Sequence, residues 1–135
     1  MALTDGELFS ESDGASGVLR FYATKVMPKQ IAATAIVLAK LTPMSFNTAS
    51  GEWAPWDANG ANGLDTIQGF LTEEAAIDTD STIRNIMLAG TIHYEDMLAA
   101  VEANGVEVEA DLLTEIRSQH LRSIGIHVEG TTGIY

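Results

Sequence analysis

The sequence contains no cysteine, and this absence excludes several kinds of chemistry at once. Without a thiol among its 135 residues, the chain can form no disulfide, no thiolate metal site and no cysteine nucleophile. We therefore expect a protein that is made in a reducing cytoplasm.

Basic residues are also scarce, because Lys and Arg number 7 against 19 Asp and Glu, which gives a formal net charge of −12. A surface this negative repels phosphate, so we expect neither nucleic acid nor a membrane as a partner. Long apolar runs are missing as well: the longest, residues 31–41, is far short of the roughly 20 residues that a membrane span needs. The start from Met1 to Asp5 lacks the basic and apolar regions of a signal peptide.

Hydrophobic residues make up 46% of the chain, which is enough for the core of one domain, and 12 glycines indicate many turns. Residues 1–17 are rich in Gly, Ser and Asp and have little to bury, so we predict a flexible N-terminal arm there. A single β-rich domain is predicted over residues 18–135. A terminus that is loose without any function remains the alternative interpretation of the arm.

Most of the domain is predicted to be strand. Residues 18–27 are rich in β-branched and aromatic side chains, which predicts a strand that ends at Pro28. Residues 31–41 fit a helix or a strand, and we favour a strand because the run is short and Pro43 follows. Further short strands are expected at residues 52–56, 66–71, 82–88, 90–94 and 124–128.

Loops and helices complete the prediction. Residues 47–51 and 57–63 are rich in Asn and Gly, which favours loops. Residues 94–103 and 110–118 place apolar side chains at helical spacing, and Asn104-Gly105 is a good end for the first of these helices. The fold class is therefore mainly β with two short helices (α+β), in a small barrel or folded-over sheet.

Charge is distributed unevenly along the chain. Residues 1–13 carry four acids and no base, whereas residues 20–40 carry four bases and no acid. These bases are Arg20, Lys25, Lys29 and Lys40. A cationic segment in an anionic protein suggests a docking surface, and internal salt bridging is an equally open interpretation.

A search for catalytic and metal-binding patterns finds no convincing site. The loop at Asp57 lacks several features of a helix–loop–helix calcium site, so a hairpin loop is favoured. The histidines (His93, His120 and His127) have no common metal spacing, and adjacent acids such as Glu73-Glu74 are best explained as solvated faces. No nucleophile elbow or phosphate-binding loop occurs. We therefore expect a protein that is not an enzyme and has no metal or cofactor.

Two tryptophans, Trp53 and Trp56, flank Ala54-Pro55. Large aromatic side chains recur at interfaces, but they also fill small cores. We expect at least one of the two to lie in the core.

Five short motifs follow one another between residues 41 and 96. They are Leu41-Thr42-Pro43-Met44, Asn47-Thr48-Ala49-Ser50, Trp56-Asp57, Ile67-Gln68-Gly69-Phe70-Leu71 and Ala89-Gly90-Thr91-Ile92-His93-Tyr94-Glu95-Asp96. In order and spacing this series resembles the central part of the lambda-type head decoration proteins of bacteriophages. The last motif carries that family's Gly-Thr and Tyr-Glu-Asp pairing. The resemblance is loose in the C-terminal part and hardly extends to the N-terminus.

The resemblance implies a structural protein of the virion. Members of that family have a small β-rich fold, often grouped with β-clip folds, and bind the outer surface of the expanded phage head as homotrimers at three-fold sites. There they act as cement proteins, which stabilise the capsid against the pressure of packaged DNA. The implied partners are the major capsid protein and the chain itself, and the protein would be made in the host cytoplasm.

The family also implies roles for individual residues. Capsid binding is expected from the arm and the first strand, namely Leu8, Phe9, Val18, Leu19, Arg20, Phe21, Tyr22 and Lys25. The motif residues expected to be structural are Thr42, Pro43, Trp56, Asp57, Gly69, Gly90, Thr91, Tyr94, Glu95 and Asp96. The alternative function is a small β-barrel binding module of a phage virion for a receptor or carbohydrate, which exposed tryptophans beside the Asp57 loop would favour. A small enzyme is the third possibility, and it would need a cleft with converging carboxylates.

Overall fold

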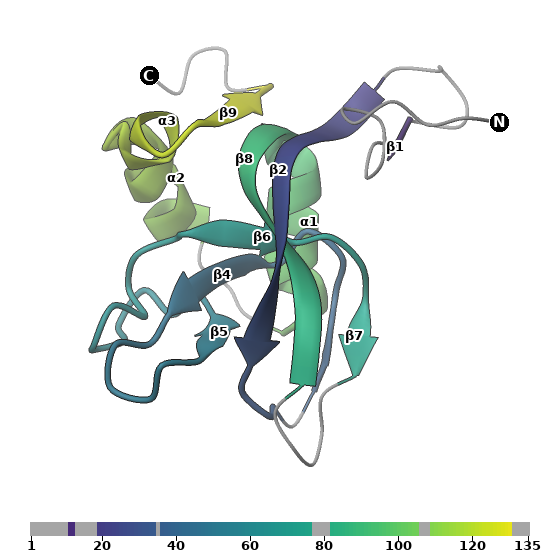
Figure 1. Ribbon diagram of the computed structural model, residues 1–135. Coiled ribbons are helices and arrows are strands. Elements are labelled where there is room, and N and C mark those ends of the chain that lie inside the picture. Colours follow the sequence, from purple (N-terminus) through teal and green to yellow (C-terminus); the bar gives the residue numbers. More distant parts are fainter. Residues whose placement is uncertain (1–10, 13–18, 35, 77–81, 106–108, 131–135) are drawn as a thin grey trace, which may run out of the picture.

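Two long strands organise the fold. Strands β2 (Leu19–Ile31) and β8 (Thr82–His93) pair antiparallel along almost their whole length. In Figure 1 this β2–β8 ribbon runs through the molecule as a twisted pair. The computed structural model describes residues 11–12, 19–34, 36–76, 82–105 and 109–130.

Three short strands close the ribbon into a small barrel. Strands β4 (Pro43–Phe46), β5 (Trp53–Pro55) and β6 (Gly69–Leu71) form an antiparallel series in which β6 joins β8 and β4 joins β5. The ring closes where β5 pairs in parallel with β2, at Ile31 opposite Trp53. The mainly β, barrel-like α+β fold that the sequence predicts is therefore confirmed.

The remaining strands lie outside this ring. β1 (Glu11–Ser12) pairs with the start of β2, and β9 (Ile126–Glu129) pairs in parallel with the end of β8. β3 (Val37–Leu38) and β7 (Ala75–Ala76) form a separate two-stranded sheet. Glu11 and Ser12 lie within the expected flexible arm, and the structure places them in a strand. The other arm residues lie outside the described part of the chain.

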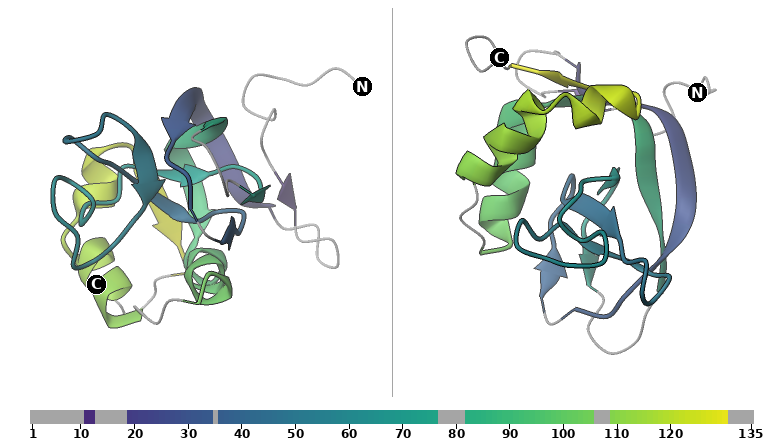
Figure 2. Two further views of the ribbon diagram at one scale, coloured as in Figure 1. Left: turned by 90° about the horizontal axis from the view of Figure 1, so that it is seen from below. Right: turned by 90° about the vertical axis from the view of Figure 1, so that its left-hand side faces the viewer.

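Helices cover one side of the barrel (Figure 2). Helix α1 (Tyr94–Ala103) has the predicted bounds: the His93 Nδ1 atom accepts a hydrogen bond from the Glu95 N–H at its start, and Gly105 follows its end with a φ of +83°. Helix α2 (Glu109–Arg117) matches the prediction to within one residue. Helix α3 (His120–Ser123) was not predicted, because a single turn has too few residues to show helical periodicity.

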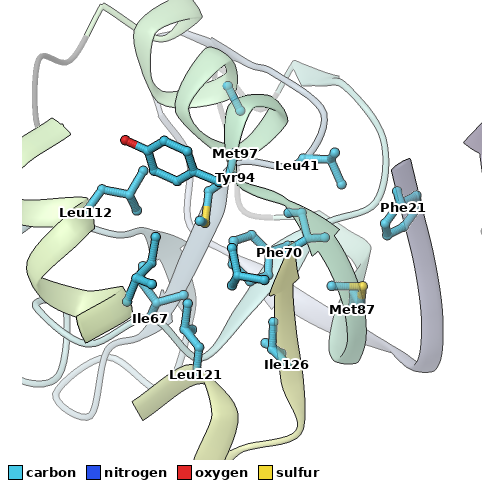
Figure 3. Packing of buried hydrophobic residues seen from close by; sticks show 14 of the residues in the cluster. Phe21, Leu41, Ile67, Phe70, Met87, Tyr94, Met97, Leu112, Leu121 and Ile126 are labelled. Atoms are coloured by element: carbon cyan, nitrogen blue, oxygen red, sulfur yellow. The ribbon is translucent and has the colours of Figure 1, made fainter. Parts of the chain in front are cut away.

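The core has two clusters of buried side chains, which meet across strand β6. Phe70 and Leu71 are neighbours on β6 and point to opposite faces, and both are fully buried. The smaller cluster receives a residue from each of the five ring strands and consists of Ile31, Leu38, Met44, Trp53, Leu71, Ala75 and Ile86. The larger cluster packs the other face of β6 against the helices. Figure 3 shows Phe70 among the larger cluster's members, which include Ile67, Tyr94, Met97, Leu112 and Leu121.

Two strand predictions near prolines are wrong. β2 continues through Pro28 to Ile31. At Pro28 the strand has a described partner, β8, on one side only, and a proline is tolerated in a strand when its nitrogen faces an unpaired side. The strand expected over residues 31–41 is reduced to Ile31 and Val37–Leu38, because the alanines between them have small side chains that gain little from a pleated sheet.

Three other boundaries also differ from the prediction. The strands expected at residues 82–88 and 90–94 are one continuous strand, β8. Gly90 adopts a φ of +148°, which only glycine adopts readily, and this lets the strand continue through that position. The strand expected over residues 66–71 is confined to β6, because turns occupy the chain before it. The closing strand begins at Ile126, since Ile124 and Gly125 form the turn after α3.

Candidate docking surface

The motif residues at the start of β4 hold the barrel to helix α1. The Thr42 hydroxyl donates to the Ala39 carbonyl at 2.6 Å and accepts from the Asn104 amide at 2.9 Å. The Asn104 side-chain oxygen in turn accepts the Ala39 N–H at 3.0 Å. Thr42 and Pro43 are buried. These contacts fix the last turn of α1 to the beginning of β4, so Thr42 and Pro43 are structural residues.

Trp56 and Asp57 organise the loop that follows β5. The Trp56 ring is 8% exposed, and its Nε1–H donates to the Asp65 carbonyl at 3.0 Å. Asp57 is exposed, and its carboxylate accepts the Asn59 N–H at 3.0 Å, which closes a local turn. The pair therefore shapes the loop.

Two motif glycines lie where the chain passes close to another strand. A Cβ atom on Gly69 would approach the Met87 carbonyl oxygen to 2.7 Å, and a Cβ on Gly90 would approach the Ala23 Cα to 2.9 Å. Both positions are buried. Glycine is needed there because any larger side chain would force the strands apart.

The final motif joins β8 to α1. Thr91 lies on β8 opposite Tyr22, and Tyr94 is the buried first residue of the helix. Glu95 is exposed in the first turn, where an acid suits the helix dipole. Burial lowers the pKa of Lys40 below its ordinary value, and the negative charge of half-buried Asp96 opposes this shift only in part. Of these motif residues, Tyr94 packs in the larger core cluster and so holds the start of α1 to the core.

Both tryptophans are buried, each at 8% exposure. Trp53 packs edge-on against Phe46, with ring centroids 6.0 Å apart, and belongs to the smaller core cluster. An exposed aromatic platform beside the Asp57 loop, which would favour the carbohydrate-binding alternative, is not formed by these residues.

The described histidines have individual contacts, and they do not form a common site. His93 caps α1, and the His120 Nε2 atom lies 2.9 Å from the Ile67 carbonyl oxygen, while His127 is exposed on β9. Glu73 and Glu74 are both exposed. Within the described ranges, no group of three or more His, Asp or Glu side chains could hold a metal ion.

The Glu115 carboxylate on α2 lies near α3 and the loop before β6. Burial raises the pKa of Glu115 above its ordinary value of 4.5. His120 and a backbone hydrogen bond from Ile67 oppose the shift, whereas the nearby Asp65 adds to it. Because the pKa is raised in the folded state, protonation of Glu115 stabilises the fold. This contribution is complete below about pH 4.5 and is lost as the pH rises through the raised pKa.

Glu115→Gln is therefore expected to stabilise the protein slightly at pH 7. The gain should be below about 1 kcal/mol, because the side chain is only half-buried and its charge is screened by solvent. The advantage over the wild type should disappear as the pH falls toward 4.5. Urea unfolding of both proteins from pH 4 to pH 8 measures this difference, and a stability gain that does not change with pH would contradict the assignment.

The cationic segment of the sequence divides into two parts in the structure. Lys40 is half-buried, and Asp96 lies near enough to act on its charge. Lys25 is exposed on the β2–β8 ribbon, and Lys29 lies over the Trp53 ring with its Nζ 5.9 Å from the ring centroid. Lys25 and Lys29 are thus the two bases of the segment that lie on the ribbon.

The ribbon adds a further base that the sequence did not connect with this segment. Arg84 lies directly opposite Lys29, and its guanidinium donates to the Thr82 hydroxyl at 3.1 Å and to the Ile83 carbonyl at 3.0 Å. Like charges directly opposite each other destabilise a sheet. An anionic group next to this pair would relieve the repulsion.

The same ribbon exposes apolar side chains. Met27 is 40% exposed and Ile83 is 60% exposed, the largest exposed fraction among the described large hydrophobic residues. Pro28 is exposed between them in the ribbon, diagonal to Ile83 on one face. Lys25, Lys29, Arg84, Met27 and Ile83 form what we call the ribbon surface, which includes both faces of the β2–β8 ribbon, because Ile83 lies on the face opposite to Met27, Lys29 and Arg84.

One edge of β2 is open along this surface. β8 occupies one side of β2, and the other side is paired with β1 at Phe21 and with β5 at Ile31. Between these two contacts, no strand of the described part of the chain lies on that side. Figure 2 shows β2 as the outermost strand there. Main-chain groups on such an edge can pair with an added strand.

The residues expected to bind a capsid have different positions. Tyr22 is half-buried and Lys25 is exposed, so both side chains are accessible on the ribbon. The Phe21 ring is 3% exposed and packs in the larger core cluster. Leu19 and Arg20 belong to β2. Leu8, Phe9 and Val18 lie outside the described residues.

Sequence reasoning missed Arg84 and Ile83, which belong to the ribbon surface only because β8 pairs with β2. Both residues are far from Lys29 in the sequence, and they come close to it only through the register in which the two strands pair.

The described helices include none that is long and apolar enough to span a membrane. No family model matches the chain, and a search of the curated proteins finds no match either.

Proposed function

We propose that the protein is a structural virion protein that binds the outer surface of an expanded phage capsid. In this proposal it binds as homotrimers at three-fold sites and stabilises the head against the pressure of packaged DNA. Its partners are the major capsid protein and further copies of itself. It acts without a cofactor and is not an enzyme.

The open edge of β2 is the observation that carries the proposal. A strand edge offers main-chain hydrogen bonds to an extended segment of a partner, and side chains on alternate positions then add specificity. Lys25 and Lys29 lie along this edge, and Arg84 lies opposite Lys29. An edge of this kind suits attachment to a protein surface better than recognition of a small molecule.

The positions of the motif residues also support the proposal. Thr42, Pro43, Trp56, Gly69 and Gly90 are all buried. The resemblance to the decoration proteins therefore falls on residues that determine this fold. A fold alone does not establish a function, so capsid attachment has to be tested directly.

Each copy of such a protein could bind the capsid weakly and the assembly would still be stable. Ordering a terminal segment costs conformational entropy, so each copy would bind its partner weakly. Trimers that bridge neighbouring capsid subunits would bind strongly together, because each contact raises the effective concentration of the next. The large negative charge does no harm on the outside of a shell whose DNA lies within.

Removing the N-terminal segment tests attachment. We expect a variant lacking residues 1–17 to remain folded and to lose binding to expanded, undecorated heads of the source phage, measured by co-sedimentation. Lys25→Glu with Lys29→Glu should weaken binding at least about tenfold, since it reverses the charge of the ribbon surface. Arg117→Glu with Arg122→Glu is the matched control, because it changes the net charge equally on other elements. Binding that survives both the truncation and the ribbon substitutions would contradict the proposed attachment surface.

A further inference from the structure

The main-chain groups on the open side of β2 can be assigned from its neighbour β8. The Asn85 carbonyl accepts the Thr72 N–H at 3.3 Å and the Thr72 hydroxyl at 3.1 Å, so Asn85 turns its main-chain groups toward β6. Pro28 lies opposite Asn85. When one residue of an antiparallel pair turns its groups away from the partner strand, the residue opposite does the same. The Pro28 carbonyl therefore points to the open side of β2.

Val26 points its main-chain groups in the same direction. It lies two residues before Pro28, and the pairing of β2 with β8 has no register shift between Val26 and Ile31. Main-chain direction alternates from residue to residue, so positions two apart agree. Ala32 continues the series, and its N–H donates to the Trp53 carbonyl of β5 at 2.9 Å, which marks the end of the open stretch. Val26 thus offers a donor and an acceptor at the open side, and Pro28 offers an acceptor only.

One face of this edge carries charge and apolar area together. Met27 and Lys29 are two residues apart on the strand and share this face, and Arg84 lies opposite Lys29. The Lys29 Nζ lies 5.9 Å from the centroid of the Trp53 ring, and the Arg84 guanidinium donates to uncharged oxygens of its own strand. These contacts orient the two bases without neutralising them. The face therefore presents two positive charges beside Met27, which is 40% exposed.

These features disfavour most strands that could join the edge. A second copy of the chain, paired through the same edge, would bring its lysines close to Lys25 and Lys29, and like charges across a pair of strands are unfavourable. Pro28 lacks an N–H, so an added strand loses one hydrogen bond there and can pair only over a short stretch. The occupant that fits is a short extended segment with negative charge.

We propose that the open edge of β2 binds a short, extended, acidic segment of a protein partner. The segment accepts the Val26 N–H and donates to the Val26 and Pro28 carbonyls, as an added strand does. Side chains directly opposite each other share a face, so a carboxylate opposite Lys29 offsets the positive charge of the Lys29–Arg84 pair. An apolar side chain two residues away then lies opposite Met27. This binding mode rests on the proposed capsid role, in which the segment belongs to the major capsid protein, and adds the chemistry by which that segment is recognised.

A peptide titration tests the edge without any capsid. The probe is an acetylated and amidated peptide, Thr-Glu-Thr-Val-Thr-Glu-Thr, which places a glutamate two residues on either side of a valine and so fits in either strand direction. Added to the ¹⁵N-labelled full-length protein, it should shift the Val26 amide resonance and slow the hydrogen exchange of that amide at least about fivefold, because the N–H becomes hydrogen-bonded. A peptide with lysines in place of the glutamates should bind at least about tenfold more weakly.

A charge exchange tests how the segment is recognised. Lys29→Glu should lose the acidic peptide and bind the lysine peptide at least about tenfold more tightly than the wild type does, which also shows that the variant is folded. Arg84→Glu, at the opposite position, is a second variant with the same expectation. Arg117→Glu is the matched control, because it makes the same charge change on α2, and it should bind the acidic peptide as the wild type does.

The pattern of binding distinguishes the outcomes. Resonance shifts centred on Val26 that are lost with the lysine peptide and reversed by the charge exchange would support the proposal. No binding of the acidic peptide, equal binding of both peptides, or shifts confined to other parts of the protein would overturn it. Failure of the edge is distinguishable from failure of the capsid role, since co-sedimentation with undecorated heads measures attachment by any surface of the protein.

Discussion

Gly90→Ala is expected to lower the free energy of unfolding by about 3–5 kcal/mol. The glycine has a φ of +148°, which L side chains rarely adopt, and this strain alone costs about 1–3 kcal/mol. The added Cβ would also collide with the Tyr22 carbonyl oxygen and lie 2.9 Å from the Ala23 Cα. Forcing the strands apart adds about 1–3 kcal/mol. The loss is a large fraction of the 5–15 kcal/mol that is usual for a folded domain.

A second glycine separates these two causes. Gly51 also has a positive φ, +75°, but apart from its two chain neighbours no residue has a heavy atom within 4 Å of the Cβ it would carry. Gly51→Ala should therefore show the strain without the collision and cost about 1–2 kcal/mol. Thermal and urea unfolding of both variants provides the comparison. Equal losses would contradict the close contact between β2 and β8 at Gly90.

Trp56→Ala is expected to cost about 3–5 kcal/mol, which is the usual range for removing a large aromatic side chain from a core. The ring lies in the larger core cluster together with Ile67 and Leu121. Its loss leaves a cavity and also removes the donor to the Asp65 carbonyl. We expect the unfolding temperature to fall by about 10–20 °C.

Trp56→Phe keeps most of the buried area and removes the hydrogen bond. This variant should lose about 1–3 kcal/mol, the cost of leaving the Asp65 carbonyl without its partner. Ile83→Ala, at a position that is 60% exposed, serves as a surface control and should change stability by less than about 0.5 kcal/mol. A fully stable Trp56→Ala variant would place the ring at the surface, as a carbohydrate- or receptor-binding module requires.

Elements with strong local signals could be predicted from the sequence. Helix α1 has acids in its first turn and Asn104-Gly105 at its end, and its bounds are as predicted. The loop at residues 57–63 follows from its Asn-Gly pairs in the same way. In these segments the residues that fix the conformation are neighbours along the chain, so their pattern is sufficient.

Other elements depend on contacts between distant residues. Pro28 is tolerated in β2 because one side of the strand is open there, and the sequence around Pro28 does not contain that information. The alanine-rich segment before Leu41 has no strong local preference, so its path is set by what packs around it. Single-turn helices such as α3 fall below the length at which periodicity can be read.

The candidate site was predicted only in part for the same reason. Lys25 was identified from the lack of acids around it, and it is exposed on the ribbon. Arg84 and Ile83 join it through strand pairing, which depends on the register of the fold. Phe21 is a large aromatic residue of the kind that recurs at interfaces, but its ring points into the core from β2.

The most direct test of the account is to look for the chain on purified, DNA-filled phage particles from its source, by mass spectrometry and surface labelling. We predict an abundant, externally accessible chain in numbers comparable to the major capsid protein. Intact, DNA-filled particles that lack the chain would contradict the proposed role in the capsid.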